Sequence, residues 1–173
     1  MADTPELWVF GYGSLLFNPG IEVADRREAI LHGYRRRFCM WSIHHRGSED
    51  APGLVLALEP HEGASCAGIA FRAAAPEAAL PSLRERELIS SAYHERQLEL
   101  ETPDGPLRAV AYVIDPAHRQ YAPDLTLERQ AEIIARASGG QGPNREYLHR
   151  TAEALTEAGI SDPEIQRLAG MVP

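Results

Sequence analysis

The sequence predicts an α+β protein in which a curled, mostly antiparallel sheet or barrel has helices beside it. Strand-like segments dominate the first 115 residues and amphipathic helical segments follow, an order typical of α+β folds. The chain has 173 residues, of which 44% are hydrophobic, so we expect one domain with a substantial core over residues 1–173. No internal repeat or low-complexity linker divides the sequence.

Strands separated by turns are predicted for the first third of the chain. After a short N-terminal tail, residues 7–12 predict a strand that ends in a glycine-rich turn. The polar segment Ile21–Arg27 predicts a short turn or helix, and Ala29–Ser42 predicts a long strand with a bulge at Gly33. The composition of residues 44–53 predicts a loop.

Two hairpins are predicted in the middle of the chain. Leu54–Leu58 and Ala67–Arg72 are mainly apolar, and the Pro, Glu and Gly residues between them favour a turn. Tyr93–Glu101 and Leu107–Ile114 are joined by Thr102-Pro103-Asp104-Gly105, which predicts a second hairpin. These hairpins are the reason to expect antiparallel pairing.

Helices are predicted between the hairpins and in the last third. Pro76–Leu88 is expected to be helical, with a kink or restart at Pro81. Three amphipathic helices follow; Asn144 is expected to cap the second, and Ser161 with Glu164 has the capping-box pattern of the third. The residues that share their apolar faces are Leu127, Ala131 and Ile134, then Tyr147, Leu148, Ala152 and Leu155, then Ile165 and Leu168.

Composition argues against several classes of function. The net charge of −8 does not favour nucleic acid, and no apolar run approaches the roughly 18 residues of a membrane span. No signal sequence follows Met1, so we expect a cytoplasmic protein with no nucleic-acid or membrane partner. All 17 basic residues are Arg, which excludes a Schiff-base or Walker lysine. Cys39, Cys66 and the seven His lack ligand spacing, so no metal site is expected and the thiols are expected to be buried.

The glycine-rich turn after the first strand is the first candidate site. In Gly11-Tyr12-Gly13-Ser14-Leu15-Leu16, two glycines free the backbone, and such a turn can aim several N–H groups at one anion. An ordinary tight turn explains the same residues. Leu16 stands where a dinucleotide fingerprint needs its third Gly, and Ser14 lacks the frame of a hydrolase nucleophile, so both of these interpretations are weak.

A carboxylate on an apolar helix face is the second candidate. Leu80, Leu83 and Glu87 have the spacing i, i+3, i+7 of a single stripe. Burial and the C-terminal end of the helix both disfavour a negative charge, so the pKa of Glu87 is expected to be raised, which suits general-base work. The alternative is a helix-end Glu that reaches solvent or pairs with Arg84.

Three consecutive arginines interrupt the long predicted strand. Alternation along a strand places Arg36 opposite its neighbours Arg35 and Arg37. A solvated face is the ordinary explanation of such a run, and a ligand facing one of the three is the alternative.

Taken in chain order, several segments resemble the gamma-glutamylcyclotransferase superfamily, and most closely its ChaC branch, the glutathione-specific enzymes. The segments that carry the resemblance are Tyr12-Gly13-Ser14-Leu15, Trp41–Gly47, Ala51–Val55, Arg86-Glu87, Tyr93 and Gly142–Leu148. The sequence departs from the family pattern at Ser91-Ala92, where the family has two glycines, and at His44, where it usually has Asp. These departures bear on the range of substrates more than on the chemistry.

The resemblance implies an AIG2-like fold: a small mixed, mostly antiparallel β-barrel with flanking helices. It implies that the α-amine of a γ-glutamyl group attacks its own γ-carbonyl. From glutathione the products are 5-oxoproline and Cys-Gly, with a small-molecule substrate and no cofactor.

The candidate residues can be given roles in this reaction. Glu87 is expected to take the proton of the α-ammonium and return it to the departing nitrogen. Backbone N–H groups of Tyr12–Leu15 are expected to hold the developing oxyanion or the glutamyl carboxylate. Tyr12 and Tyr93 are candidate pocket walls and hydroxyl donors, with ordinary packing as the alternative. Arg37 and Arg46 are candidates for the distal carboxylate of the substrate.

Two alternatives remain open from the sequence. The substrate could be another γ-glutamyl amide or amine rather than glutathione. The chain could also be a non-catalytic regulatory module that only binds γ-glutamyl compounds, although a carboxylate placed on an apolar stripe argues against that.

Overall fold

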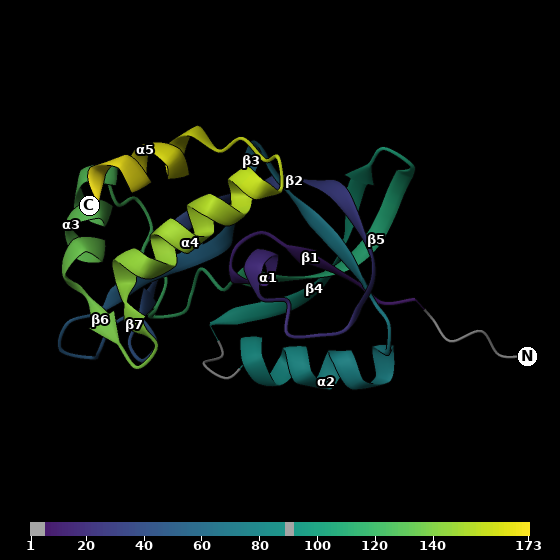
Figure 1. The fold of residues 1–173 in the computed structure, drawn as a ribbon, viewed down its shortest axis with the longest axis horizontal. Helices are drawn as coiled ribbons and strands as arrows, with labels where there is room; N and C mark the ends of the chain where they lie inside the picture. Colours follow the sequence, from purple (N-terminus) through teal and green to yellow (C-terminus); the bar gives the residue numbers. More distant parts are fainter. Residues whose placement is uncertain (1–5, 89–91) are drawn as a thin grey trace, which may run out of the picture.

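Five strands close into a barrel in the order β1-β3-β2-β4-β5, with helices around it (Figure 1). The computed structural model describes residues 6–88 and 92–173, so most of the predicted N-terminal tail and Ser91 lie outside the described residues. The strands are β1 (Trp8–Gly11), β2 (Val23–Ser42), β3 (Gly53–Ala73), β4 (Tyr93–Thr102) and β5 (Gly105–Ile114). All pairs are antiparallel except β1 with β5, which meet in parallel at Val9 and Val110. The predicted mixed, mostly antiparallel barrel is confirmed.

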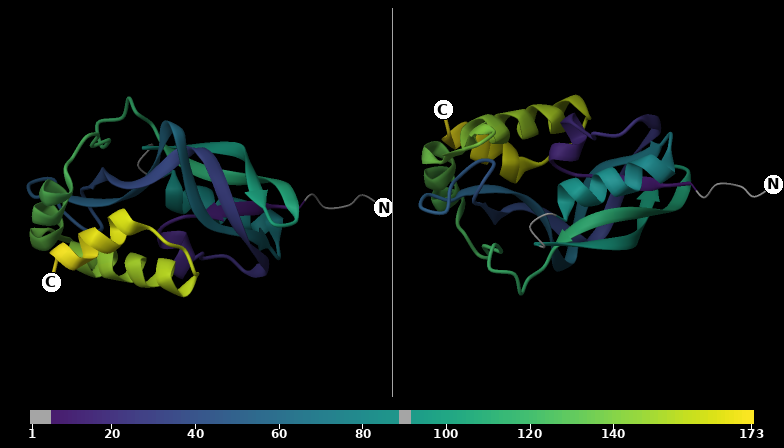
Figure 2. Two further views of the ribbon diagram at one scale, coloured as in Figure 1. Left: turned by 90° about the horizontal axis from the view of Figure 1, so that it is seen from above. Right: turned by 90° about the horizontal axis from the view of Figure 1, so that it is seen from below.

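The helices lie on two sides of the barrel (Figures 1 and 2). They are α1 (Ser14–Phe17), α2 (Pro76–Glu87), α3 (Leu127–Arg136), α4 (Asn144–Glu157) and α5 (Pro163–Met171), and a two-stranded ribbon of β6 (Ser138–Gly139) and β7 (Gly142–Pro143) precedes α4. In Figure 1, α2 runs below the barrel, and α4 and α5 run above it. The helical last third is confirmed, and none of the described helices is long and apolar enough to cross a membrane.

The core fills the barrel and the space under the C-terminal helices. Its largest fully buried side chains include Phe10, Phe38 and Phe71 from the barrel and Leu148 from α4, all in one cluster. Burial of such side chains contributes about 1.5–3 kcal/mol each, so the cluster dominates the stability of the fold. Both cysteines are buried free thiols, as expected.

Two predictions for the strands are wrong, because pairing with a distant segment decides these elements. Ile21–Arg27 was expected to hold a turn or helix, but β2 already begins at Val23 and pairs with the end of β3. The hairpin expected between Leu54–Leu58 and Ala67–Arg72 is instead one continuous strand, β3, which pairs with β2 on both sides of residues 61–64. Gly33 on β2 and Gly63 on β3, both with positive φ, lie at this register shift.

The second hairpin and the first long helix agree better with the sequence. β4 and β5 pair from Tyr93 with Ile114 down to Thr102 with Gly105, as predicted. Helix α2 begins at Pro76 as expected, but it continues through Pro81 without a restart. Pro81 lies on the exposed side of the helix, where a missing backbone hydrogen bond can be compensated by water.

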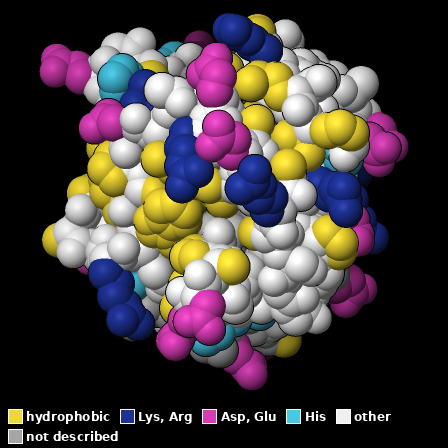
Figure 3. All heavy atoms as spheres, turned by 90° about the vertical axis from the view of Figure 1, so that its left-hand side faces the viewer, with side chains coloured by type: hydrophobic (Ala, Val, Ile, Leu, Met, Phe, Trp, Pro, Cys, Tyr) yellow, Lys and Arg dark blue, Asp and Glu magenta, His cyan; other side chains and the backbone are white. Residues whose placement is uncertain are grey.

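Charges of both signs are interspersed on the end of the molecule that lies on the left of Figure 1. Figure 3 shows arginine and acidic side chains there around a central group of apolar side chains. Among the described residues on this face, no continuous basic stripe is present of the kind that nucleic acid requires.

Candidate active site

A cavity of about 670 Å³ lies where the turn after β1, the end of α2, the start of β4 and the loop after β2 meet. Its lining includes the whole predicted turn Tyr12–Leu15 together with Glu87, Tyr93 and Arg46. These segments are far apart in the sequence, and the closed barrel brings them together. Of the predicted site residues, Arg37 alone is not part of the lining.

Glu87 is the last residue of α2, and its side chain is only 12% exposed. Burial raises the pKa of this carboxyl group, and the neighbouring Arg86, whose Nε lies 3.6 Å from Oε1, counteracts part of the rise. The expected rise in pKa is therefore confirmed. Pairing with Arg84 does not occur, because Arg84 binds Glu95 at 3.0 Å.

Three buried tyrosines surround this end of the cavity. Burial raises the pKa of Tyr12 and Tyr93 well above its usual range and that of Tyr147 to about 12, so all three phenols stay neutral. The Tyr12 hydroxyl donates to the carbonyl of Tyr112 at 3.2 Å, and the Tyr93 hydroxyl donates to the carbonyl of Leu56 at 3.1 Å. Tyr12 and Tyr93 therefore form part of the cavity wall, and their hydroxyl protons are already used in hydrogen bonds to main-chain carbonyls. Their oxygens can still accept a hydrogen bond from a bound cation.

The glycine-rich turn is held tightly against the cavity wall. Gly13 lies so close to β3 that a Cβ placed on it would be 3.3 Å from Leu56 Cδ1 and 3.7 Å from the Tyr147 hydroxyl. Gly13 precedes the single turn of α1, and the first N–H groups of a helix lack intrahelical partners. The N–H groups at Ser14 and Leu15 are therefore suited to bind an oxygen of a ligand in the cavity.

The two arginines proposed for a distal carboxylate have different positions. Arg46 is buried in the cavity wall, where its Nη1 donates to the carbonyl of Pro143 at 3.2 Å and its guanidinium lies over the ring of Tyr147. Its buried Nε has no hydrogen-bond partner among the described residues. Arg37 instead binds Glu164 at 3.2 Å and the carbonyl of Leu125 at 3.0 Å, outside the cavity. The structure brings Arg46 to the site and leaves Arg37 out of it.

The family model for ChaC-like proteins matches residues 7–173. This chain belongs to the ChaC-like protein family. It is 34% identical over 171 residues to the glutathione-specific gamma-glutamylcyclotransferase of Escherichia coli (strain K12), with 96% of this chain and 72% of that protein covered. It is 36% identical to glutathione-specific gamma-glutamylcyclotransferase 1 of Homo sapiens, with 91% and 73% covered. A solved yeast gamma-glutamylcyclotransferase specific to glutathione is 26% identical, with a TM-score of 0.84 and coverage of 97% and 98%. The resemblance found in the sequence is confirmed.

Two residues of the ChaC-like site received no role from the sequence. Arg86 connects the turn to the Glu87 carboxylate. Its Nη2 donates to the Ser14 hydroxyl at 3.2 Å, and its Nη1 donates to the carbonyl of Asn18 at 2.6 Å. Its Nε faces Glu87. Tyr147 accepts from the N–H of Leu56 at 3.2 Å. Both residues lie inside sequence segments that carry the family resemblance. Their position in these segments is the feature of the sequence that could have marked them as site residues.

The predicted caps of the last two helices are wrong, for two different reasons. Asn144 is the first residue of α4, and its side-chain amide accepts from the N–H of Leu54 and donates to its carbonyl, both at 2.8 Å. It thereby fixes the wall of the cavity to β3 instead of capping its own helix. At α5, Asp162 is the cap and accepts from the N–H of Ile165, while Glu164 binds Arg37. At α4 a tertiary contact outweighs the local capping pattern, whereas at α5 the cap lies one residue later than predicted, directly before Pro163 at the first helical position.

A raised pKa at Glu87 has a consequence for stability. The folded state holds this proton more tightly than the unfolded state, whose Glu pKa is about 4.3, so stability is lost as pH rises through the folded pKa. Glu87→Gln has no such charge to bury. We therefore expect the variant to unfold at higher urea concentration than the wild type at pH 7, with the difference vanishing near pH 4. A variant less stable than the wild type at pH 7 would contradict a desolvated carboxylate.

Proposed function

We propose that this ChaC-like chain is a cyclotransferase that converts glutathione into 5-oxoproline and Cys-Gly. One observation carries the proposal: the buried carboxyl of Glu87, with its raised pKa, shares a cavity with the glycine-rich turn. The names of the relatives support glutathione as the substrate. The two free cysteines fit a reducing cytoplasm, in which we place the reaction.

Glu87 serves as the proton relay. The α-amine of the substrate is an ammonium at neutral pH and has to lose a proton before its nitrogen can attack. Two protons move from the attacking nitrogen to the cysteinyl nitrogen, and Glu87 carries them one at a time, first as base and then as acid. The hydroxyl oxygens of Tyr12 and Tyr93 accept from the ammonium and hold it beside the carboxylate.

The turn stabilises the charge that develops during ring closure. Nucleophile and electrophile belong to one γ-glutamyl group, so the protein only has to select the folded conformer in which the nitrogen lies next to the γ-carbonyl. As the new C–N bond forms, the carbonyl oxygen becomes an oxyanion that accepts from N–H groups of the turn Gly13–Leu15. Collapse of this intermediate breaks the bond to the cysteinyl nitrogen and releases 5-oxoproline.

Arg46 binds the other end of the substrate. Arg46 lines the cavity, its buried Nε has no hydrogen-bond partner among the described residues, and an arginine with unused donors matches a carboxylate well. The glycine carboxylate is the part of glutathione that this residue recognises. A γ-glutamyl amine lacks that carboxylate, so Arg46 favours the tripeptide over the alternative substrates.

The test is the release of 5-oxoproline from glutathione, compared with γ-glutamyl-alanine, γ-glutamyl-lysine and the glycine ethyl ester of glutathione. We expect glutathione to be turned over best. The ester is expected to have a KM about 10- to 100-fold higher, because a hydrogen bond to a charged group contributes about 1.5–3 kcal/mol. Arg46→Met should remove most of the difference between glutathione and its ester.

Other results would favour the alternatives. Faster turnover of γ-glutamyl-lysine would make the chain a cyclotransferase for γ-glutamyl amines, and an Arabidopsis thaliana relative with the broader name gamma-glutamylcyclotransferase 2-3 keeps that possibility relevant. Binding of glutathione without any product would indicate a regulatory module.

A further inference from the structure

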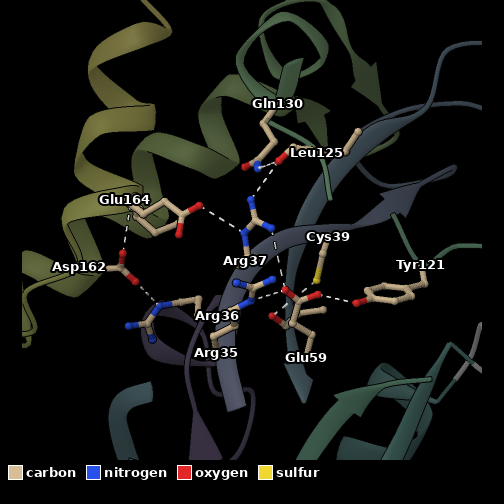
Figure 4. A network of polar contacts seen from close by, with 12 residues as sticks. Arg35, Arg36, Arg37, Cys39, Glu59, Tyr121, Leu125, Gln130, Asp162 and Glu164 are labelled. Carbon is tan, nitrogen blue, oxygen red and sulfur yellow. Dashed lines mark hydrogen bonds and ion pairs between the residues drawn. The ribbon is translucent and has the colours of Figure 1, made fainter. Parts of the chain in front are cut away.

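Arg36 is the middle residue of the three consecutive arginines of β2, and it is the most buried of them. Its side chain is 3% exposed, against 33% for Arg35 and 13% for Arg37. Figure 4 shows that Arg35 and Arg37 both reach Glu59, whereas Arg36 is directed to Asp162. None of the three belongs to the cavity lining described above. The mechanism proposed above therefore gives these arginines no role.

The contacts of Arg36 lead to the glycine-rich turn. Its Nη1 donates to the main-chain carbonyl of Tyr12 at 3.0 Å and to that of Ala67 on β3 at 2.9 Å. Its Nε donates to Asp162 Oδ2 at 2.9 Å, and Asp162 is itself fixed by capping α5. The guanidinium therefore connects the turn to the barrel wall and to the C-terminal helices.

The carbonyl of Tyr12 belongs to the same peptide group as the N–H of Gly13. A peptide group is planar and trans, so its C=O and N–H point in opposite directions. A donor that holds the Tyr12 carbonyl on one side therefore fixes the direction of the Gly13 N–H on the other side. Gly13 lines the cavity, and no side chain of its own limits rotation of this peptide plane.

We propose that Arg36 is a positioning residue for the cyclotransferase reaction: it sets the peptide plane between Tyr12 and Gly13 so that the turn presents its N–H groups to the substrate. This inference rests on the proposed function. Asp162 compensates the charge of Arg36, because a buried guanidinium without a counter-ion would be strongly destabilising.

Arg37 provides a matched control on the next residue of the strand. It also holds α5 and the segment before α3, through Glu164 and the carbonyl of Leu125, but among the described residues its hydrogen bonds and ion pairs do not include the turn. Replacing either arginine weakens the attachment of the C-terminal helices. Only replacement of Arg36 releases the Tyr12 carbonyl.

The experiment compares Arg36→Met, Arg36→Lys and Arg37→Met with the wild type in the 5-oxoproline assay, alongside thermal unfolding. We expect kcat/KM of Arg36→Met to fall about 10- to 100-fold below that of Arg37→Met, since small misplacements in a site cost up to about 100-fold. A fall in kcat at constant KM would indicate that the Gly13 N–H binds the oxyanion. A rise in KM would indicate that it binds the glutamyl carboxylate of the substrate. Arg36→Lys should lie between Arg36→Met and the wild type.

Equal activities of Arg36→Met and Arg37→Met would overturn the inference, because the role of Arg36 would then be structural only. If Arg36→Met does not fold, Arg36→Gln and Arg37→Gln replace the two Met variants, and equal activities of these two proteins would likewise overturn the inference. Hydrogen exchange of the amides at residues 13–15 needs no activity: we expect faster exchange in the Arg36 variant and unchanged exchange in Arg37→Met. A wild type that releases no 5-oxoproline would refute the proposed function, and the exchange data would still decide the role of Arg36.

Discussion

Glu87→Gln is expected to abolish the release of 5-oxoproline while the protein remains folded. Gln has the shape of Glu, but it can neither accept the ammonium proton nor donate one to the leaving nitrogen. Loss of a general acid–base group costs about 10²–10⁴-fold in rate, and Glu87 acts in both halves of the reaction, so a loss of at least about 10³-fold in kcat is expected. Steady-state kinetics together with titration of glutathione into the variant measure both turnover and binding.

Glu77→Gln is the matched control for this variant. It removes the same charge from the same helix ten residues earlier, where the side chain is exposed and outside the cavity lining. We expect Glu77→Gln to keep activity within a few-fold of the wild type, in line with the small effect of most surface changes. Wild-type turnover in Glu87→Gln, or equal losses in the two variants, would remove Glu87 from the mechanism.

Gly13→Val is expected to inactivate the protein, whereas Ser14→Ala is expected to keep most of the activity. A Cβ at Gly13 is already tight against Leu56, so the two methyl groups of Val have to push the turn away from β3. Loss of one oxyanion donor costs about 10²–10³-fold, and displacement of the whole turn should cost at least about 100-fold in kcat. Ser14→Ala removes only a hydroxyl that accepts from Arg86 and leaves the backbone N–H in place.

The pair of variants separates two chemistries. A folded Ser14→Ala protein without activity would indicate that the hydroxyl itself reacts, and a covalent mechanism would then have to be considered. Circular dichroism and thermal unfolding of both variants distinguish loss of activity from loss of fold.

Local patterns were sufficient to predict two segments that the structure brings together in the cavity lining. The spacing of Leu80, Leu83 and Glu87 along one helix placed the carboxylate on an apolar face, because helical periodicity depends only on neighbouring residues. The glycines around Tyr12 marked the turn for the same local reason.

Contacts between distant segments limited what the sequence could predict. Arg37 and Arg46 have the same side chain, and the sequence makes both of them candidates for binding a substrate carboxylate. Only the fold shows that the guanidinium of Arg37 is already hydrogen-bonded to Glu164. Asn144 has every property of a helix cap, and its partner Leu54 lies 90 residues away. The continuous strand β3 could not be predicted either, because its two halves pair with β2 on both sides of residues 61–64, which have no partner on β2.

The parallel contact between β1 and β5 determines the order in which the site can form. The partners in the β2–β3 hairpin are at most 50 residues apart in the sequence, whereas Val9 meets Val110, and the Tyr12 hydroxyl reaches a carbonyl 100 residues along the chain. Contacts between such distant residues close late in folding, because the entropy of loop closure has to be overcome first. The turn follows β1, while Glu87 precedes the β4–β5 hairpin, so the two halves of the proposed catalytic site meet only when the barrel closes. A partly folded chain therefore carries both sets of reactive groups but cannot use them, and the return of catalysis on refolding reports barrel closure.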